Sequence, residues 1–237
     1  MNLGLAGKRA IVLGASRGIG YACAEALARE GSSVAMAARD EAALSKAASK
    51  IAQDCGVPVF HKTCDVTSDA DRTTFIEATT ARFGQVDILI NNCGGPKVGG
   101  LSDVPDWKDW QEAIERSLLQ VVKWTLAVRP SMKAWGRIVN IVSTSVKQSI
   151  DGLLLSNTMR PGVIGFSKSI ARELAANGIT INSVLPGRIR TERTAEIARQ
   201  RAEKENIPLE QVLQERLRDI PAGRLGLPGH QRRFHGR

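Results

Sequence analysis

The chain has 237 residues, of which 43% are hydrophobic and 24% charged, the proportions of an ordinary globular protein. This length suits one α/β domain or two small ones, and such a core needs neither disulfides nor a structural metal. No apolar run approaches the ~20 residues that span a bilayer, so we expect a cytoplasmic protein without a membrane segment or a signal peptide.

The pattern of cysteines argues against a metal site, and the distribution of basic charge argues against a nucleic-acid-binding protein. Cys23, Cys55, Cys64 and Cys93 form no C-x-x-C pair and lack clustered histidines, so we expect free thiols and no metal site. The net charge is +9, but it gathers partly in the last twenty residues, without a nucleic-acid motif. We expect no nucleic-acid or membrane partner. A basic nucleic-acid binder would instead show salt-sensitive DNA affinity that disappears when residues 228–237 are deleted.

Short apolar runs alternate with helical patterns through the first half of the chain. Strands are predicted at residues 9–14, within 57–66, and at 33–38 and 86–92. Helices are predicted at residues 18–31, 40–54 and about 69–83. Gly31 ends the first helix, and either Ser68 or Asp69 could cap the third.

The alternation continues after a glycine-rich loop at 93–100. Helices are predicted at residues 107–133 and 157–177, and strands at 137–143 and 179–185. Continuous apolar strands that alternate with helices indicate a parallel sheet covered on both faces. The sequence therefore predicts an α/β fold with a doubly wound parallel sheet of the Rossmann type, joined by right-handed crossovers.

The last fifth of the chain differs in character. Residues 191–219 are charged and helical but interrupted at "NIPLEQV". We interpret them as a substrate flap on a single dinucleotide-binding and catalytic domain of residues 1–227. Residues 228–237 are predicted to form an irregular basic tail.

The turn "GASRGIG" places glycines at positions 14, 18 and 20, directly after a strand and before a helix. Glycines let the backbone approach a pyrophosphate, and the start of a helix offers free N–H groups and the positive end of its dipole. The strand–turn–helix context predicts a dinucleotide site in preference to a tight turn without a ligand.

Four more motifs follow this turn in order: "CDVT" at 64–67, "NNCGG" at 91–95, "GRIVNIVS" at 136–143 and "ITINSVLPG" at 179–187. Together with the spacing G-x-x-x-G-x-G they resemble the short-chain dehydrogenase/reductase family, specifically its 3-oxoacyl-carrier-protein-reductase-like branch. The resemblance runs from about residue 5 to 227 and implies an oxidoreductase acting on a small-molecule carbonyl or alcohol.

The resemblance also bears on the end of the chain and on assembly. Relatives continue into another helix and a seventh strand where this chain reads "GHQRRFHGR", so we expect both elements to be lacking. A truncated end and a naturally short one both remain open. The resemblance implies a homodimer or larger homo-oligomer, paired through the helices at 107–133 and 157–177.

The end of the second strand bears on the choice of coenzyme. An acidic residue there would bind a ribose 2′-hydroxyl and repel a 2′-phosphate, whereas this chain has Ala38 followed by Arg39. Arg17 in the glycine turn is a second cation, and two guanidinium groups can bind a phosphate through charge-assisted hydrogen bonds. We expect NADP(H) in preference to NAD(H). The alternative is that Arg39 merely faces water.

The turn and the resemblance together give the expected cofactor-binding residues. The turn contributes Gly14, Ser16, Arg17, Gly18, Ile19 and Gly20. The resemblance implies adenine contacts from Asp65 and Val66, a ribose side of Asn91, Cys93 and Gly94, and a nicotinamide end held by Pro186, Gly187, Ile189 and Thr191. Cys93 is interpreted as a small filler, because no nearby histidine could activate it as a nucleophile.

The resemblance implies a catalytic tetrad of serine, tyrosine, lysine and asparagine, and this chain keeps one member. Ser143 matches the serine that orients the carbonyl. Ser156 stands where the proton-donating tyrosine is expected, Arg160 where the lysine is expected, and Ser117 where the asparagine is expected. A phenol has a pKa near ~10 that a cation can lower, whereas a serine hydroxyl is a much poorer proton donor.

Other groups could replace the missing acid. Arg160 stays protonated but can hold a ribose or stabilise an oxyanion. The only tyrosine, Tyr21, lies beside the pyrophosphate turn, too far away to substitute. Lys147 and Lys97 could donate protons if desolvation lowers their pKa, although each can equally be a solvated surface lysine. Ser145 is a weaker candidate.

Pro161 follows Arg160 and lacks a backbone N–H, so it fits best in the first turn of its helix, with Ser156 or Asn157 as the cap. The sequence thus predicts an NADP-dependent oxidoreductase with a degenerate tetrad and an unassigned proton source. The alternative is a weak or inactive NADP-binding pseudoenzyme or partner module.

Overall fold

The computed structural model describes residues 3–218 and 220–229. The chain forms two compact units, Met1–Leu185 and Pro186–Arg237. We call them the first and the second unit.

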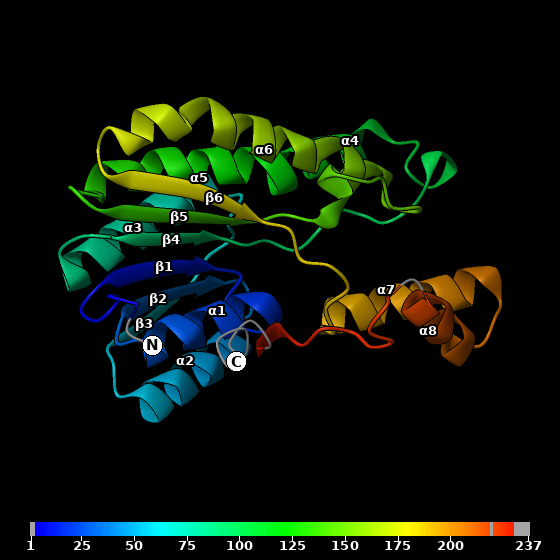
Figure 1. The fold of residues 1–237 in the computed structure, drawn as a ribbon, viewed down its shortest axis with the longest axis horizontal. Coiled ribbons are helices and arrows are strands. Elements are labelled where there is room, and N and C mark those ends of the chain that lie inside the picture. The colour runs from blue at the N-terminus through cyan, green and yellow to red at the C-terminus, as the bar shows by residue number, and fades with distance from the viewer. Residues whose placement is uncertain (1–2, 219, 230–237) are drawn as a thin grey trace. The chain divides into compact units, whose positions relative to one another are not determined.

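The first unit is built on a six-stranded parallel sheet with the order β3-β2-β1-β4-β5-β6 (Figure 1). The strands are β1 Arg9–Leu13, β2 Ser33–Ala38, β3 Val59–Thr63, β4 Ile88–Asn91, β5 Gly136–Ile141 and β6 Ile179–Val184. The order reverses between β1 and β4, which makes the carboxyl ends of these two strands the topological switch point. The predicted doubly wound Rossmann-type sheet is confirmed.

Helices cover both faces of this sheet (Figure 1). They are α1 Gly18–Arg29, α2 Glu41–Cys55, α3 Asp69–Phe83, α4 Trp107–Ile114, α5 Gln120–Val128 and α6 Leu154–Ala175. Alternate residues of β1 serve the two layers, because side chains alternate across a strand. Ile11 packs in one cluster with Phe75 and Trp124, whereas Val12 packs in the other with Leu44.

Two helices begin at side-chain caps that the sequence indicates. The Asp40 carboxylate accepts the Ala43 N–H at 3.0 Å and starts α2. The Ser68 hydroxyl accepts the Asp71 N–H at 3.2 Å and starts α3. Of the two predicted caps of α3, Ser68 is therefore the one used.

The helix predicted at 107–133 is present as a continuous helical segment from Trp107 to Ser131, but the expectation of one regular α-helix is wrong. A π-helical turn, Glu115–Leu119, separates α4 from α5, and a short 3₁₀ turn, Arg129–Ser131, ends the segment at a proline. The extra residue of a π turn shifts the face that follows it. The polar side chains of Ser117, within this turn, and Gln120, directly after it, are buried. Apolar periodicity does not reveal such an insertion, because the pattern on either side remains helical.

The predicted start of α6 is also wrong. The helix begins at Leu154, so neither Ser156 nor Asn157 is its cap, and Pro161 lies in the helix interior. Leu155 and Val163 are both buried and lie two turns apart on either side of the proline. We infer that the burial of this face offsets the ~3 kcal/mol that an interior proline costs.

Asn157 makes two hydrogen bonds to the loop that precedes α6. Its amide donates to the Ile150 carbonyl at 2.9 Å, and its side-chain oxygen accepts the Ile150 N–H at 3.2 Å. An isolated bridge also pairs Gly99 with Leu153. The loop after β5 is thereby held to the helix that follows it.

The second unit contains α7 Glu192–Glu205 and α8 Leu209–Arg218, which pack through Ala198, Ala202 and Val212. Asn206 has a left-handed backbone with φ of 50° and ends α7. The helical character and the break at "NIPLEQV" are thus confirmed. From residue 230 on, the predicted basic tail lies outside the described residues.

A buried amide pair joins the two central strands of the first unit. Asn91 of β4 donates to Asn140 of β5 at 2.8 Å and to the Thr125 hydroxyl at 3.2 Å. Asn140 donates in turn to the Ser167 hydroxyl of α6 at 3.0 Å. These bonds link β4, β5, α5 and α6 inside the core.

A second polar contact lies at the amino ends of β1 and β4. The Asp87 carboxylate is 2% exposed and accepts from Arg9 Nε at 2.6 Å, from the Arg9 backbone at 2.8 Å and from Gln85 at 2.8 Å. Burial alone would raise the pKa of Asp87, but the hydrogen bonds from Arg9 and Gln85 and the Arg9 charge outweigh it and lower that pKa.

We predict that Asp87→Asn lowers the free energy of unfolding by about 2 kcal/mol at pH 7, because charged hydrogen bonds to Arg9 are lost. A lowered folded pKa adds stability above about pH 4, and this stability disappears as the pH falls through the folded pKa. Urea unfolding at pH 7 and pH 3 should therefore show a gap between wild type and variant that shrinks in acid. The control is Glu77→Gln on the surface of α3. An equal gap at both pH values would contradict the prediction.

Candidate active site

The glycine turn after β1 is shaped by steric limits. Gly14 and Gly18 have left-handed φ angles of 59° and 61°. A Cβ on Gly20 would collide with the Gly14 carbonyl oxygen, so this close approach requires glycine. The turn leads directly into α1, whose first N–H groups have no partner within the helix. Such a turn can receive an anionic group against the backbone.

Asn92, which the sequence reasoning did not single out, fixes this turn. Its side-chain amide donates to the carbonyls of Leu13 and Gly14 at 3.1 and 3.3 Å. It follows β4, so it joins the carboxyl end of that strand to the end of β1. The paired asparagines of "NNCGG" were the available signal, because a polar residue directly after a buried strand needs partners.

Asp65 and Val66 follow β3. The Asp65 carboxylate accepts from Thr67 N at 2.9 Å and from the Thr67 hydroxyl at 2.7 Å. Burial would raise the pKa of Asp65, but the Thr67 bonds, with the charges of Arg39 and Arg116, lower it. Asp65 therefore stays ionised at neutral pH. Val66 is buried, and its carbonyl accepts the Trp124 ring N–H at 2.9 Å.

Ser143 lies two residues after β5. Its hydroxyl oxygen accepts the Ser145 N–H at 3.1 Å and caps a short 3₁₀ turn. That bond uses the oxygen as an acceptor and leaves the Ser143 proton available to another group. The Ser145 hydroxyl is buried and has no partner among the described residues.

Ser156 and Arg160 form a pair on α6. Arg160 Nε donates to the Ser156 hydroxyl oxygen at 3.1 Å, and Arg160 Nη1 donates to the carbonyls of Ile141 and Val142 at 3.3 and 2.9 Å. Burial lowers the pKa of Arg160 from its ordinary value. The guanidinium thus binds the carboxyl end of β5 to the serine one turn earlier on its own helix.

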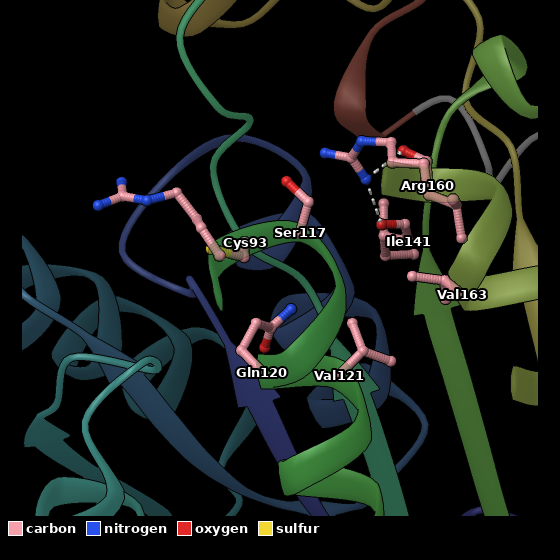
Figure 2. Close-up of a pocket in the computed structure, with 9 residues that line it drawn as sticks. Cys93, Ser117, Gln120, Val121, Ile141, Arg160 and Val163 are labelled. Carbon is pink, nitrogen blue, oxygen red and sulfur yellow. Dashed lines mark hydrogen bonds between the residues drawn. The ribbon is translucent and has the colours of Figure 1, made fainter. Parts of the chain in front are cut away.

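A small cavity of about 10 Å³ lies beside Arg160. Figure 2 shows its two walls, with Ser117, Gln120 and Val121 on one side and Ile141, Arg160 and Val163 on the other. Cys93 and Arg116 also line it. Of these residues, the sequence reasoning named Cys93, Ser117 and Arg160 as site residues and assigned no role to Gln120 and Arg116.

Cys93 lies in this cavity wall as a weak acid. Burial raises the pKa of its thiol, and the charges of Arg116 and Arg160 only partly oppose that effect. It therefore stays protonated near neutral pH, as expected of a filler. Gly94 is exposed beside it.

The remaining cofactor positions divide between the two units. Ser16 and Ile19 are half-buried in the glycine turn, and Arg17 and Arg39 are exposed. The second unit contains Pro186, Gly187, Ile189 and Thr191. The Thr191 hydroxyl accepts the Thr194 N–H at 3.2 Å and caps α7.

The alternative proton donors differ in their exposure and in the direction of their pKa shifts. Lys97 is 51% exposed and pairs with Asp109 at 2.8 Å, and this hydrogen bond raises the pKa of the lysine. The hypothesis that desolvation lowers it is therefore wrong. Lys147 is exposed. Tyr21 has a pKa raised by burial and by Glu25, and it packs with the α1–α2 layer.

The described residues contain no group of three or more His, Cys, Asp and Glu side chains that could bind a metal ion. None of their helices is long and apolar enough to cross a membrane.

Known proteins match this chain over most of its length. The 3-oxoacyl-acyl-carrier-protein reductase FabG of Escherichia coli is 37% identical over 222 residues, which cover 93% of this chain and 84% of the relative. A solved structure of actinorhodin polyketide ketoreductase with NADPH has a TM-score of 0.88 at 32% identity, and covers 94% of this chain and 86% of that one.

A second solved structure is that of L-sorbose reductase from Gluconobacter frateurii with NADPH and L-sorbose. Its TM-score is 0.91 at 27% identity, and the match covers 99% of this chain and 90% of that one. Residues 8–202 match the family described as short chain dehydrogenase. The chain therefore belongs to the short-chain dehydrogenase family and is an oxidoreductase of that type.

Proposed function

We propose that this protein uses NADP(H) to interconvert a carbonyl and an alcohol in a small molecule. The observation that carries the proposal is the glycine turn, where Gly14 and Gly20 are too close for side chains and α1 begins. That backbone fits the phosphates of a dinucleotide. Two similar structures contain NADPH, which supports the phosphorylated coenzyme.

The proposed coenzyme contacts follow the positions that the sequence predicts. We propose that Arg17 and Arg39 bind the 2′-phosphate, that Asp65 and Val66 contact the adenine, and that Asn91, Cys93 and Gly94 line the ribose side. Pro186, Gly187, Ile189 and Thr191 are proposed to hold the nicotinamide end. When bound, NADPH would supply the hydride.

Two serine hydroxyls are the proposed carbonyl ligands. Each accepts one hydrogen bond within the protein, Ser143 from a backbone N–H and Ser156 from Arg160, so each retains its own proton to donate. The cationic donor on Ser156 polarises its hydroxyl. We propose that both stabilise the oxygen as negative charge develops, and that proton delivery is slower than with a phenol.

Ser156 and Arg160 are proposed to occupy the tyrosine and lysine positions of the family, with Ser117 at the asparagine position.

A weak or inactive NADP-binding partner module is the second candidate function. It is favoured by the contacts of Arg160 Nη1 with the carbonyls of Ile141, the last residue of β5, and of Val142, the next residue. That arrangement gives the guanidinium a structural task without any reaction.

Assembly and domain boundaries stay predictions. A homo-oligomer paired through α4, α5 and α6 is supported by the exposed Trp107 and Leu126, which are 67% and 55% accessible. Residues 1–227 as one catalytic domain, with a substrate flap at 191–219, rest on the sequence pattern.

We predict that Arg39→Ala weakens NADPH binding about 10- to 100-fold and leaves NADH binding unchanged, because only NADPH carries the phosphate. Isothermal titration calorimetry with each coenzyme measures both affinities. Lys46→Ala, an exposed cation of α2, is the matched control. An equal loss of both coenzymes, or of neither, would remove Arg39 from the phosphate site.

We predict slow NADPH oxidation by wild type on a panel of ketones and 3-oxoacyl thioesters, lost in Ser143→Ala but kept in Ser149→Ala, an exposed serine of the same loop. Ser156→Tyr with Arg160→Lys should raise this rate about 10²-fold, because a phenol is the better acid. The control is Ser156→Phe with Arg160→Lys, which has the bulk of the tyrosine side chain but lacks its hydroxyl.

The outcomes separate the two candidate functions. Tight NADPH binding without turnover on any substrate supports the partner module. If the Tyr/Lys variant binds NADPH but turns over no faster than the Phe/Lys control, Ser156 and Arg160 do not occupy the proposed positions.

A further inference from the structure

Arg216 is a half-buried cation of the second unit, near the end of α8. No carboxylate of the described residues forms an ion pair with it. By contrast, Arg201 of α7 pairs with Glu205 at 2.8 Å and with Glu215 at 2.7 Å. Removing a cation from water without a counter-ion is unfavourable, so the position of Arg216 indicates a task or a bound anion.

One hydrogen bond fixes the Arg216 guanidinium. Its Nη1 donates to the Thr194 carbonyl at 2.7 Å, in the first turn of α7. Its Nε and Nη2 have no hydrogen-bond partner within the described part of the chain. In Arg9 the same two nitrogens bind both oxygens of Asp87, Nε at 2.6 Å and Nη2 at 3.1 Å. The corresponding edge of Arg216 can therefore bind the two oxygens of an anion.

Arg188 brings a second positive charge to Arg216. Burial lowers the pKa of Arg216, and the charges of Arg188 and Arg201 lower it further. This repulsion shows that Arg188 lies near enough for its charge to act on the Arg216 guanidinium. A bound anion would be attracted by both cations and would offset their repulsion.

Arg188 lies on a segment that is held on two sides. Its carbonyl accepts the Gly226 N–H at 3.0 Å. The carbonyl of the next residue, Ile189, accepts the Thr194 hydroxyl at 2.9 Å. Thr194 thus contacts both the segment that carries Arg188 and the guanidinium of Arg216. The backbone of Arg188 and the guanidinium of Arg216 are positioned before any ligand binds, which lowers the entropic cost of binding.

We propose that Arg216, together with Arg188, forms an anion subsite that binds the carboxylate or phosphate of a small-molecule substrate. The Nε and Nη2 edge of Arg216 binds two oxygens of the anion, and Arg188 adds the second charge. The inference rests on the proposed function in one respect, namely that residues 191–219 form the substrate flap. It narrows the substrate class to carbonyl or alcohol compounds that carry an anionic group.

Calorimetry on the full chain without coenzyme tests the subsite. We expect inorganic phosphate or succinate to bind wild type with a Kd of roughly 1 mM, and Arg216→Gln to weaken this binding about tenfold. The tighter of the two ligands identifies the anion as phosphate or carboxylate. Arg199→Gln, which removes an exposed cation of α7, is the matched control with the same change of net charge.

Arg188→Gln is the second variant, and it replaces Arg216→Gln if that variant does not fold. It leaves the bond between Arg216 and Thr194 in place and removes only the second charge. We expect it to weaken the same anion about threefold or more, with an unchanged melting temperature.

A matched pair of substrates tests whether the subsite serves the reaction. One is a ketone with the anion that calorimetry favours and the other is its neutral analogue, for example a keto acid and its methyl ester. Arg216→Gln should raise the KM of the charged substrate about tenfold. It should leave kcat, the KM of the neutral analogue and the affinity for NADPH unchanged, since only the charged substrate uses the subsite.

The proposal is overturned if neither anion binds wild type, if Arg199→Gln weakens the anion as much as Arg216→Gln, or if the KM values of both substrates rise equally. It is also overturned if Arg216→Gln weakens NADPH binding, because the anion would then belong to the coenzyme. If wild type turns over no substrate, the proposed function fails, and calorimetry alone decides whether the anion subsite exists.

Discussion

The side-chain amide of Asn92 ties the ends of β1 and β4 together at the point where the sheet reverses its order. By binding the carbonyls of Leu13 and Gly14, it sets the glycine turn that leads into α1. The other site elements extend from this junction: Cys93 continues from β4, and Ser143 follows the neighbouring β5. Parallel strands bring their carboxyl ends to one edge, so the Asn92 bonds place the glycine turn beside the end of β4 at that edge.

Arg160 stands where the family resemblance implies a lysine, and the proposed function depends on this difference. A lysine ammonium is a compact charge on a flexible stem, whereas a guanidinium is a planar fork that never loses its proton. Here that fork is anchored on two main-chain carbonyls and on Ser156. Ser156 therefore lies beside a fixed cation, and under the proposed function this pair would hold an oxyanion and would not relay protons.

Much of the fold follows from local sequence. Alternating apolar runs predict the six strands, and the candidate caps Ser68 and Asp69 predict the start of α3, because period and capping are properties of a few neighbouring residues. The glycine turn can likewise be predicted from neighbouring residues. The start of α6 cannot, since the burial of Leu155 in the tertiary structure outweighs the preference of Pro161 for the first turn of a helix. The π-helical turn depends on packing that no short window of sequence contains.

The amide pair between Asn91 and Asn140 has a consequence for how the central strands find one another. The neighbouring residues Ile90 and Val139 are apolar and nearly interchangeable, so hydrophobicity alone tolerates a shifted alignment. A slip of β5 by one residue would break the 2.8 Å hydrogen bond between the two amides. We infer that the Asn91–Asn140 pair specifies the register of β4 and β5 during folding. It would disfavour misaligned pairings of these strands even where it adds little to the final stability.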